Sequence, residues 1–218
     1  MSAPAANFDP LARFYRALEI IAFGGDLERA RFCLLAQLAD RRSILVLGEG
    51  DGRALARLVQ LAPLARVHCI DFSAAMLAHA QARLAGTEAA TRVTFEHADV
   101  LTCEFRPEHF DAVVTLFLLD CFDAAQAAGL VTRVCAALQP GAAWLFADFV
   151  LPARGPARWR ARLWLGLLYA FFRWQTGLRT RELPPSESLI RAAGFECAAV
   201  RNFQWGLLRS AFFRQPAR

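Results

Sequence analysis

The chain has 218 residues, 56% of them apolar and 21% charged, which fits one globular domain large enough to bury a core without disulfide or metal staples. All 25 basic residues are arginine, and the net charge of +5 is unevenly placed. Residues 1–150 carry 13 Arg against 17 acidic residues (−4), whereas residues 151–218 carry 12 Arg against 3 Glu (+9). The basic character therefore belongs to the C-terminal third.

The cysteines form no CxxC pair and no zinc-like spacing, so we expect a reduced chain with no metal site. The N-terminus lacks a basic start followed by an apolar core, so it shows no signal-peptide pattern, and we expect a cytoplasmic location. The uncharged run 163–172 is too short to span a bilayer, which takes about 20 residues.

Apolar spacing predicts helices over 9–22 and 26–39, with Gly24 and Gly25 ending the first and Asp26 capping the second. Short apolar runs then alternate with helical stretches. The runs are 44–47, 66–70, 92–96, 111–116 and 142–149, and the helical stretches are 53–61, 73–85 and 123–138. This alternation predicts an α/β fold with a parallel sheet covered on both faces.

The pattern changes after residue 150. A long helix over 157–175 is rich in Arg and Trp, the segment ELPPSES starts a short helix that ends at AAGF, and residues 195–202 and 205–213 predict a final hairpin. The hairpin would add one antiparallel strand to the sheet.

The segment SILVLGEGDGRAL, residues 43–55, places three glycines at alternate positions directly after the first apolar run. In an open α/β sheet, a ligand binds at the carboxyl ends of the strands, where such a loop lies. The spacing differs from the dinucleotide motif G-x-G-x-x-G, because Arg53 occupies the place of the third glycine. Glu49 and Asp51 would also repel a pyrophosphate, so we expect a cofactor that carries positive charge, such as S-adenosylmethionine.

Two further carboxylates follow neighbouring strands. Asp71 ends the second strand about twenty residues after the loop, where it could accept ribose hydroxyls. Asp99 follows the third strand and could accept from an adenine amino group, with Ala98 and Val100 offering backbone groups to the ring.

Taken together, the segments LGEGDG, DFSAAMLAHAQARL, HADV, FDAVVTLFLLDCF and LQPGAAWLFADF resemble class I S-adenosylmethionine-dependent methyltransferases of the small-molecule type. The resemblance covers residues 44–149. It implies a Rossmann-like, seven-stranded, mostly parallel sheet of order 3-2-1-4-5-7-6 with strand 7 antiparallel and helices on both faces.

The resemblance also implies a cofactor site, with the glycine loop on the methionyl part and Leu116 and Phe117 on the sulfonium side. The residues expected to bind the cofactor are Gly48, Glu49, Gly50, Asp51, Gly52, Asp71, Phe72, Met76, Ala98, Asp99, Val100, Leu116, Phe117 and Tyr15. Tyr15 belongs to a segment similar to the capping helix of small-molecule members. One departure is Val46, which occupies a position where the family commonly has an acid, so Glu49 or Asp51 would have to contact the cofactor's ammonium group.

Asp120 and Asp148 follow the fourth and fifth strands and are the candidates for a general base, if the acceptor must lose a proton. The alternative for Asp120 is a helix N-cap, a role for which Asp123 competes.

We expect a single domain over 1–218, with a helical cap at 1–40 and a helical insertion at 150–193 that covers the substrate. Three interpretations of the Arg-rich helix stay open: a lid over a small, apolar acceptor, a core helix, or peripheral membrane contact through 158–174. Nucleic acid is not expected as a partner, because no RNA-binding module accompanies the domain. The alternative function is a non-catalytic protein that binds S-adenosylmethionine or acts as a scaffold.

Overall fold

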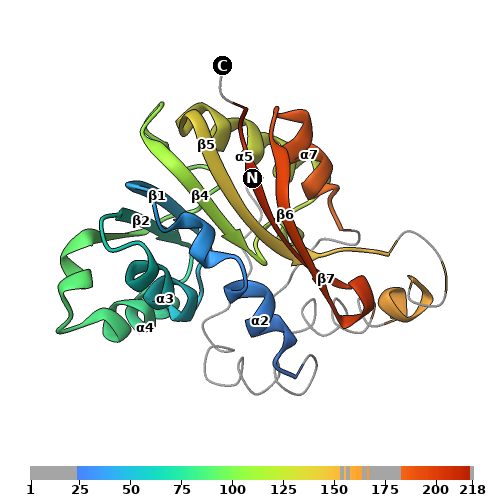
Figure 1. The fold of residues 1–218 in the computed structure, drawn as a ribbon, viewed down its shortest axis with the longest axis horizontal. Helices are drawn as coiled ribbons and strands as arrows, with labels where there is room; N and C mark the ends of the chain where they lie inside the picture. The colour runs from blue at the N-terminus through green and yellow to red at the C-terminus, as the bar shows by residue number, and fades with distance from the viewer. Residues whose placement is uncertain (1–23, 153–154, 156–157, 164–165, 167–182, 217–218) are drawn as a thin grey trace, which may run out of the picture.

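The computed structural model describes residues 24–152, 155, 158–163, 166 and 183–216. Its centre is a seven-stranded sheet of order β3-β2-β1-β4-β5-β7-β6, in which β7 is antiparallel to both β5 and β6 (Figure 1). The predicted fold class and strand order are therefore confirmed. The strands are β1 (Ser43–Leu47), β2 (Arg66–Asp71), β3 (Val93–His97), β4 (Phe110–Leu116), β5 (Leu138–Phe149), β6 (Glu196–Phe203) and β7 (Leu208–Arg214).

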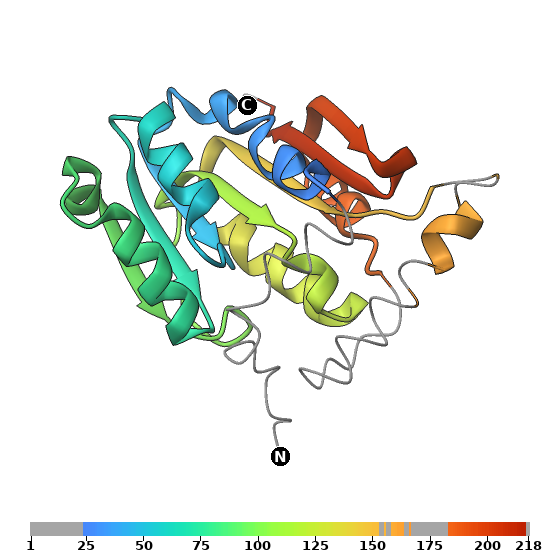
Figure 2. The ribbon, with the colours of Figure 1, turned by 90° about the horizontal axis from the view of Figure 1, so that it is seen from below.

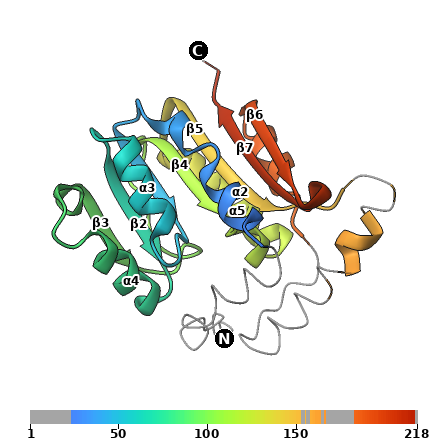
Figure 3. The same cartoon turned by 60° about the horizontal axis from the view of Figure 1, so that its bottom comes forward.

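Two apolar clusters cover the two faces of the sheet, because successive strand residues point to opposite sides. Ile44 and Val46 pack with α3 (Arg53–Leu61) and α4 (Ala74–Leu84). Leu45 and Leu47 pack with α5 (Ala124–Ala137) and α7 (Ser186–Ala192). The result is a three-layer arrangement, which Figure 3 shows with β3 and α4 at one side and the β6–β7 hairpin at the other.

Two local predictions about the N-terminal part were wrong. The helix expected over 26–39 ends early: α2 spans Asp26–Phe32, and a 3₁₀ helix, η2, follows at Leu35–Leu38. The N-cap is Gly25, not Asp26, and Asp26 lies in the first turn, where it pairs with Arg29 and accepts from Gln204. An acid in the first turn is also favourable, because the helix dipole places positive charge there.

The competition between Asp120 and Asp123 is resolved. Asp123 is the N-cap of α5: it accepts from the backbone N–H of Gln126, whose side chain accepts in return from the backbone of Asp123. This reciprocal capping box satisfies two backbone donors at the helix start. Asp120 lies in a separate 3₁₀ turn, η4 (Leu119–Cys121), and is left available for another role.

The carboxyl ends of the parallel strands share one edge of the sheet. In Figure 1 the arrowhead of β4 points to the bottom of the view, and Figure 2 looks onto the molecule from that side. The glycine loop and the segments after β2, β3, β4 and β5 all lie at this edge. A third apolar cluster adjoins it and joins Leu27 and Ala30 of α2 to Ala161 and Leu207, with Phe117 and Phe149 packed against it.

Gly52 allows the two helices beside the loop to approach closely. Its φ is +83°, and a Cβ atom added there would lie 2.4 Å from Cα of Ala80 in α4. Gly86 has a similar φ of +75°, but an added Cβ would meet nothing within 4 Å. Substitutions at Gly86 and Gly52 therefore distinguish the cost of backbone strain alone from the cost of strain together with a steric clash.

We predict that Gly86→Ala lowers the free energy of unfolding by about 1–2 kcal/mol, the cost of a left-handed conformation for a residue with a Cβ. Gly52→Ala should lower it by distinctly more, because a backbone clash adds to that cost. Denaturant unfolding of both variants measures the difference, and equal losses would show that the contact between α3 and α4 can relax.

Candidate active site

The glycine loop turns sharply between β1 and α3. Gly48, Gly50 and Gly52 all have positive φ, of +64°, +74° and +83°, a conformation that side chains with a Cβ rarely adopt. A Cβ at Gly48 would lie 2.6 Å from the Leu118 side chain, whereas a Cβ at Gly50 would meet nothing within 4 Å. Gly50 therefore leaves open space at the edge where the other candidate residues meet.

Asp71 fixes this loop against the end of β2. One of its carboxylate oxygens accepts from the backbone N–H of Gly50 at 3.1 Å, and the other accepts from the N–H of Ser73 at 2.9 Å. Its backbone carbonyl accepts from Ala98 at 3.2 Å. Asp71 thus ties the glycine loop to the segment after β3.

The segment after β3 is also fixed in place. One carboxylate oxygen of Asp99 accepts from the N–H of Leu101 at 2.9 Å. The Arg133 guanidinium, from α5, donates to the carbonyls of Val100, Leu101 and Cys103. Arg133 was not singled out in the sequence, because its partners lie about thirty residues away and no local spacing marks the contact.

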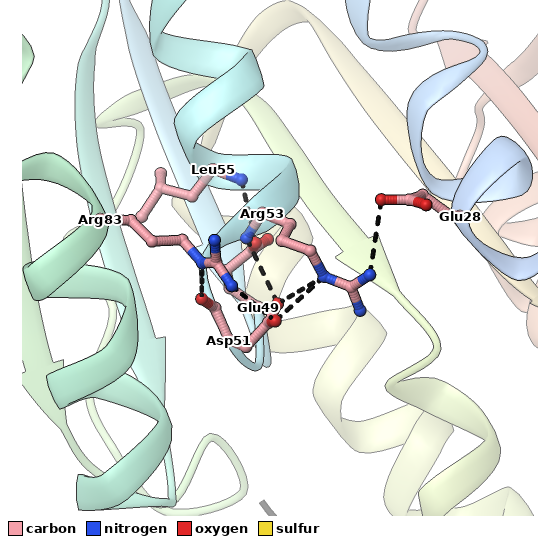
Figure 4. Close-up of polar contacts among 6 residues, drawn as sticks. All are labelled: Glu28, Glu49, Asp51, Arg53, Leu55 and Arg83. Atoms are coloured by element: carbon pink, nitrogen blue, oxygen red, sulfur yellow. Dashed lines mark hydrogen bonds and ion pairs between the residues drawn. The ribbon is translucent and has the colours of Figure 1, made fainter. Parts of the chain in front are cut away.

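The two acids of the loop differ in their surroundings. Asp51 pairs with Nε of Arg53 at 3.0 Å and with Nη2 of Arg83, from α4, at 3.0 Å, as Figure 4 shows. Partial burial acts to raise the pKa of Asp51, but the hydrogen bond and charge of Arg53 and the charge of Arg83 outweigh it and hold that pKa below its usual value. Asp51 is therefore an ionised carboxylate already matched by two arginines.

Glu49 has a different environment. Its Oε1 atom accepts from the backbone N–H of Leu55, in the first turn of α3, at 2.9 Å (Figure 4). Its Oε2 atom is sealed from solvent and has no hydrogen-bond partner among the described residues. Burial raises the pKa of Glu49 to about 7, against the lowering effects of the Leu55 N–H and the Arg31 charge.

Asp120 and Asp148 form a buried pair at the ends of β4 and β5, with 9% and 1% of their surface exposed. The backbone N–H of Asp120 donates to Asp148 at 3.2 Å, and the two carboxyl groups are hydrogen-bonded to each other. Burial is the main cause that raises both pKa values, that of Asp120 to about 6 and that of Asp148 well above its usual range. The two carboxyl groups therefore titrate as one pair, which retains a proton to higher pH than two separate aspartates would.

Aromatic rings lie next to this pair. Phe117 has a φ of +57°, a strained value for a residue with a Cβ, and its N–H donates to Ala147 of β5 at 2.7 Å. Its ring packs against Phe149 with centroids 5.3 Å apart, and the Arg31 guanidinium lies 5.3 Å from its centre. Arg31 acts electrostatically on both Glu49 and Asp120, so this arginine of α2 links the loop to the acid pair.

The structure thus brings most of the predicted site residues to one edge of the sheet. Leu116 is buried at the end of β4, Met76 is buried behind the loop, and Phe72 is 45% exposed beside the His97 ring. Tyr15 lies outside the described residues. Arg31 and Arg83 are additional residues of this edge that the sequence did not reveal, since their contacts depend on how α2 and α4 pack.

The covering elements are described only in part. Residues 1–23 of the expected cap and most of 158–174 lie outside the described residues, so the membrane contact stays a prediction. Within the described part, Trp159 and Leu163 are 72% and 52% exposed. Among the described residues, no helix has the length and apolar character required to cross a bilayer.

Comparison with known proteins finds matches to methyltransferases. Residues 44–141 match the methyltransferase domain family. Uncharacterized methyltransferases of Mycobacterium tuberculosis and Mycobacterium bovis are 30% identical over 122 residues, which are 56% of this chain and 58% of each relative. The alignment therefore spans less than two thirds of these relatives.

Solved structures share the fold at lower identity. Mitomycin 7-O-methyltransferase superposes with a TM-score of 0.67 at 20% identity, over 95% of this chain and 58% of that one. The N-methyltransferase NodS of Bradyrhizobium japonicum, solved with S-adenosyl-L-homocysteine, gives 0.61 at 18% identity, over 87% and 88% of the two chains. The predicted resemblance is confirmed: residues 44–141 match a methyltransferase domain, and the chain shares the fold of solved methyltransferases of the class whose cofactor is S-adenosylmethionine.

The residues present fit that cofactor. Asp71 offers acceptors for ribose hydroxyls, Gly50 leaves space for close approach of a ligand, and Glu49 has a buried oxygen without a partner. The sequence argument from charge needs correction, however. Two acids were expected to repel a phosphate, but Arg53 and Arg83 pair with Asp51, whereas Glu49 has no ion pair among the described residues.

The Asp120–Asp148 pair also makes the stability of the folded state depend on pH. Because the folded pKa values of Asp120 and Asp148 are raised, the folded state binds protons more tightly than the unfolded state. This contribution is fully present below about pH 4, near the ordinary pKa of aspartate, and is lost as pH rises through 6 and above. Asp120→Asn removes one charge and keeps an amide that can donate to Asp148.

We therefore predict that the melting temperature falls less steeply between pH 5 and 7 in Asp120→Asn than in the wild type. Other titrating groups contribute equally to both proteins, so thermal denaturation over this pH range isolates the pair. Parallel curves would contradict a shared proton.

Proposed function

We propose that this chain transfers a methyl group from S-adenosylmethionine to a hydroxyl or amine of a small, largely apolar acceptor, and that Asp120 takes the proton the acceptor loses. The observation that carries the proposal is the Asp120–Asp148 pair, which is buried at the carboxyl edge of the sheet and in which burial raises the pKa of both carboxyl groups. S-adenosylmethionine, when bound, supplies a methyl group on a positively charged sulfur.

The proton balance of the reaction explains why such a pair is useful. An acceptor O–H or N–H that gains a methyl group forms an O–C or N–C bond and must release one proton. Asp120 is ionised above a pKa of about 6, so it can receive that proton near neutral pH. Asp148 accepts from the backbone N–H of Asp120 and is hydrogen-bonded to its side chain, which keeps the Asp120 carboxylate oriented.

The surroundings support an apolar acceptor. Phe117 and Phe149 place two aromatic rings at this edge, and the apolar cluster that joins α2 to Ala161 and Leu207 lies beside them. We propose that the cap at 1–40 and the insertion at 150–193 cover the site and exclude water, within a single domain over 1–218. Neighbours in fold include human N-acetylserotonin methyltransferase and a Planctomyces limnophilus O-methyltransferase solved with apigenin, which supports a small molecule as acceptor.

The cofactor part of the proposal is tested by calorimetry with S-adenosylmethionine, S-adenosylhomocysteine and NAD. We expect the first two to bind and NAD not to bind. Turnover is then tested by screening hydrophobic phenols, quinones and amines for formation of S-adenosylhomocysteine. Cofactor binding without turnover of any acceptor in that screen would favour the alternative, a non-catalytic protein that binds the cofactor.

We predict that Asp120→Asn lowers kcat by about 10²- to 10⁴-fold, the usual contribution of a general base, while the affinity for S-adenosylmethionine changes little. The acidic limb of the pH–rate profile near pH 6 should also disappear. Asp123→Asn is the matched control, because asparagine caps a helix about as well as aspartate. Full activity of Asp120→Asn would exclude Asp120 as the base.

A further inference from the structure

Val46 cannot bind the cofactor's ammonium group, because its side chain has no acceptor. This residue stands in β1 where the family commonly has an acid, but here its side chain is apolar, 1% exposed and packed in the core with the α3 face of the sheet. An ammonium ion buried without a partner is costly, since it loses its hydration. Another acceptor at this edge is therefore needed if the cofactor binds.

Asp51 does not meet that need. Arg53 and Arg83 contact its carboxylate at 3.0 Å each, and Arg83 also donates to its backbone carbonyl at 2.7 Å. An ammonium at Asp51 would approach two guanidinium groups of the same charge. Glu49 lies two residues earlier in the same loop and has no such ion pair among the described contacts.

Glu49 has the properties of an anchor for a cation. Leu55 N–H holds Oε1 at 2.9 Å, which fixes the side chain, while Oε2 is buried with no hydrogen-bond partner in the described part of the chain. A buried acceptor left unpaired costs about 1–3 kcal/mol, more if it is charged. An ammonium has three N–H donors and a positive charge, so it would supply both the missing hydrogen bond and an opposite charge for the carboxylate.

Glu49 also lies close to the residue that is expected to bind the ribose. Gly50, the next residue, donates its N–H to Asp71, the residue expected to accept the ribose hydroxyls. Burial is the main cause that raises the pKa of the Cys69 thiol in β2, and the charges of Glu49 and Asp71 both raise it further. A ligand with a ribose at one end and an amino acid at the other can contact both.

We propose that Glu49 binds the ammonium group at the amino-acid end of the cofactor through its free oxygen, in place of the acid missing at Val46. This assignment rests on the proposed function and adds a pH dependence to it. The positive charge favours ionised Glu49, so binding releases a proton when Glu49 is protonated beforehand. Affinity therefore rises with pH through about 7, the pKa of Glu49.

The other groups that face Glu49 do not produce this rise. Arg31 of α2 stays charged throughout, the pKa of Asp51 is lowered, and the pKa of Cys69 is raised far above neutrality by burial. The cofactor's own α-amino group has an ordinary pKa of about 8 and sets the upper limit of the useful range. Asp120 titrates with a pKa of about 6, so the window from about pH 6.5 to 7.5 reports mainly on Glu49.

The experiment compares three ligands by calorimetry on the full chain: S-adenosylmethionine, S-adenosylhomocysteine and 5′-methylthioadenosine, which keeps the nucleoside but lacks the amino-acid end. We expect Glu49→Gln to weaken the first two by about 10- to 100-fold at pH 7.5, the effect of losing a charge-assisted hydrogen bond, and to abolish their pH dependence. Binding of 5′-methylthioadenosine should stay unchanged, which also shows that the variant is folded. Glutamine keeps an oxygen that can accept from Leu55.

Glu28→Gln is the matched control: Glu28 is an acid of α2 that is 44% exposed and contacts Arg53 at 3.4 Å, and this variant should bind all three ligands like the wild type. Equal affinity of Glu49→Gln and wild type for S-adenosylhomocysteine would overturn the assignment. An equal loss for all three ligands would overturn it too, because it would show that Glu49 only maintains the loop. A wild-type chain that binds none of the three would reject the proposed function itself.

Discussion

The buried carboxyl group of Glu49 links the fold to the chemistry expected at its edge. One oxygen is held by the first turn of α3, and the other is enclosed without a partner beside a loop whose three glycines all have positive φ. The loop can hold the carboxylate there because Asp71 fixes Gly50 and because Gly52 lets α3 lie against α4. A buried, half-satisfied acid reduces stability, and natural proteins commonly retain such costs at functional sites.

The buried Asp120–Asp148 pair lies at the same edge of the sheet and differs from Glu49 in its hydrogen-bond partners. Asp120 and Asp148 are hydrogen-bonded to each other, whereas Oε2 of Glu49 has no hydrogen-bond partner among the described residues. Arg31 acts on both systems, since its charge lowers the pKa of Glu49 and of Asp120. The edge therefore combines an acceptor suited to a cation with a carboxylate suited to a proton. In the proposed methyl transfer, Glu49 binds the ammonium group of the cofactor and Asp120 takes the proton that the acceptor loses.

Much of the fold could be predicted from the sequence, because hydrophobic periodicity and turn residues act locally. Helix α3 was predicted with its observed bounds, and the order of the strands followed from the family motifs. The helix over 26–39 was overextended, because its apolar spacing continues past Phe32 while the backbone changes to a 3₁₀ turn. The site acids were recognisable for the same local reason: they lie at or shortly after the C-terminal ends of strands. Their partners were not, since Arg83 reaches Asp51 across 32 residues and only tertiary packing brings them together.

The central claim is that the carboxyl edge of this sheet binds S-adenosylmethionine with its amino-acid end at the glycine loop. A crystal structure of the chain with S-adenosylhomocysteine tests it most directly. The account predicts the ligand's amino group within hydrogen-bond distance of Glu49 Oε2 and its ribose hydroxyls at Asp71. A ligand whose amino group contacts neither Glu49 nor the loop around Gly50, or one bound away from this edge, would contradict it.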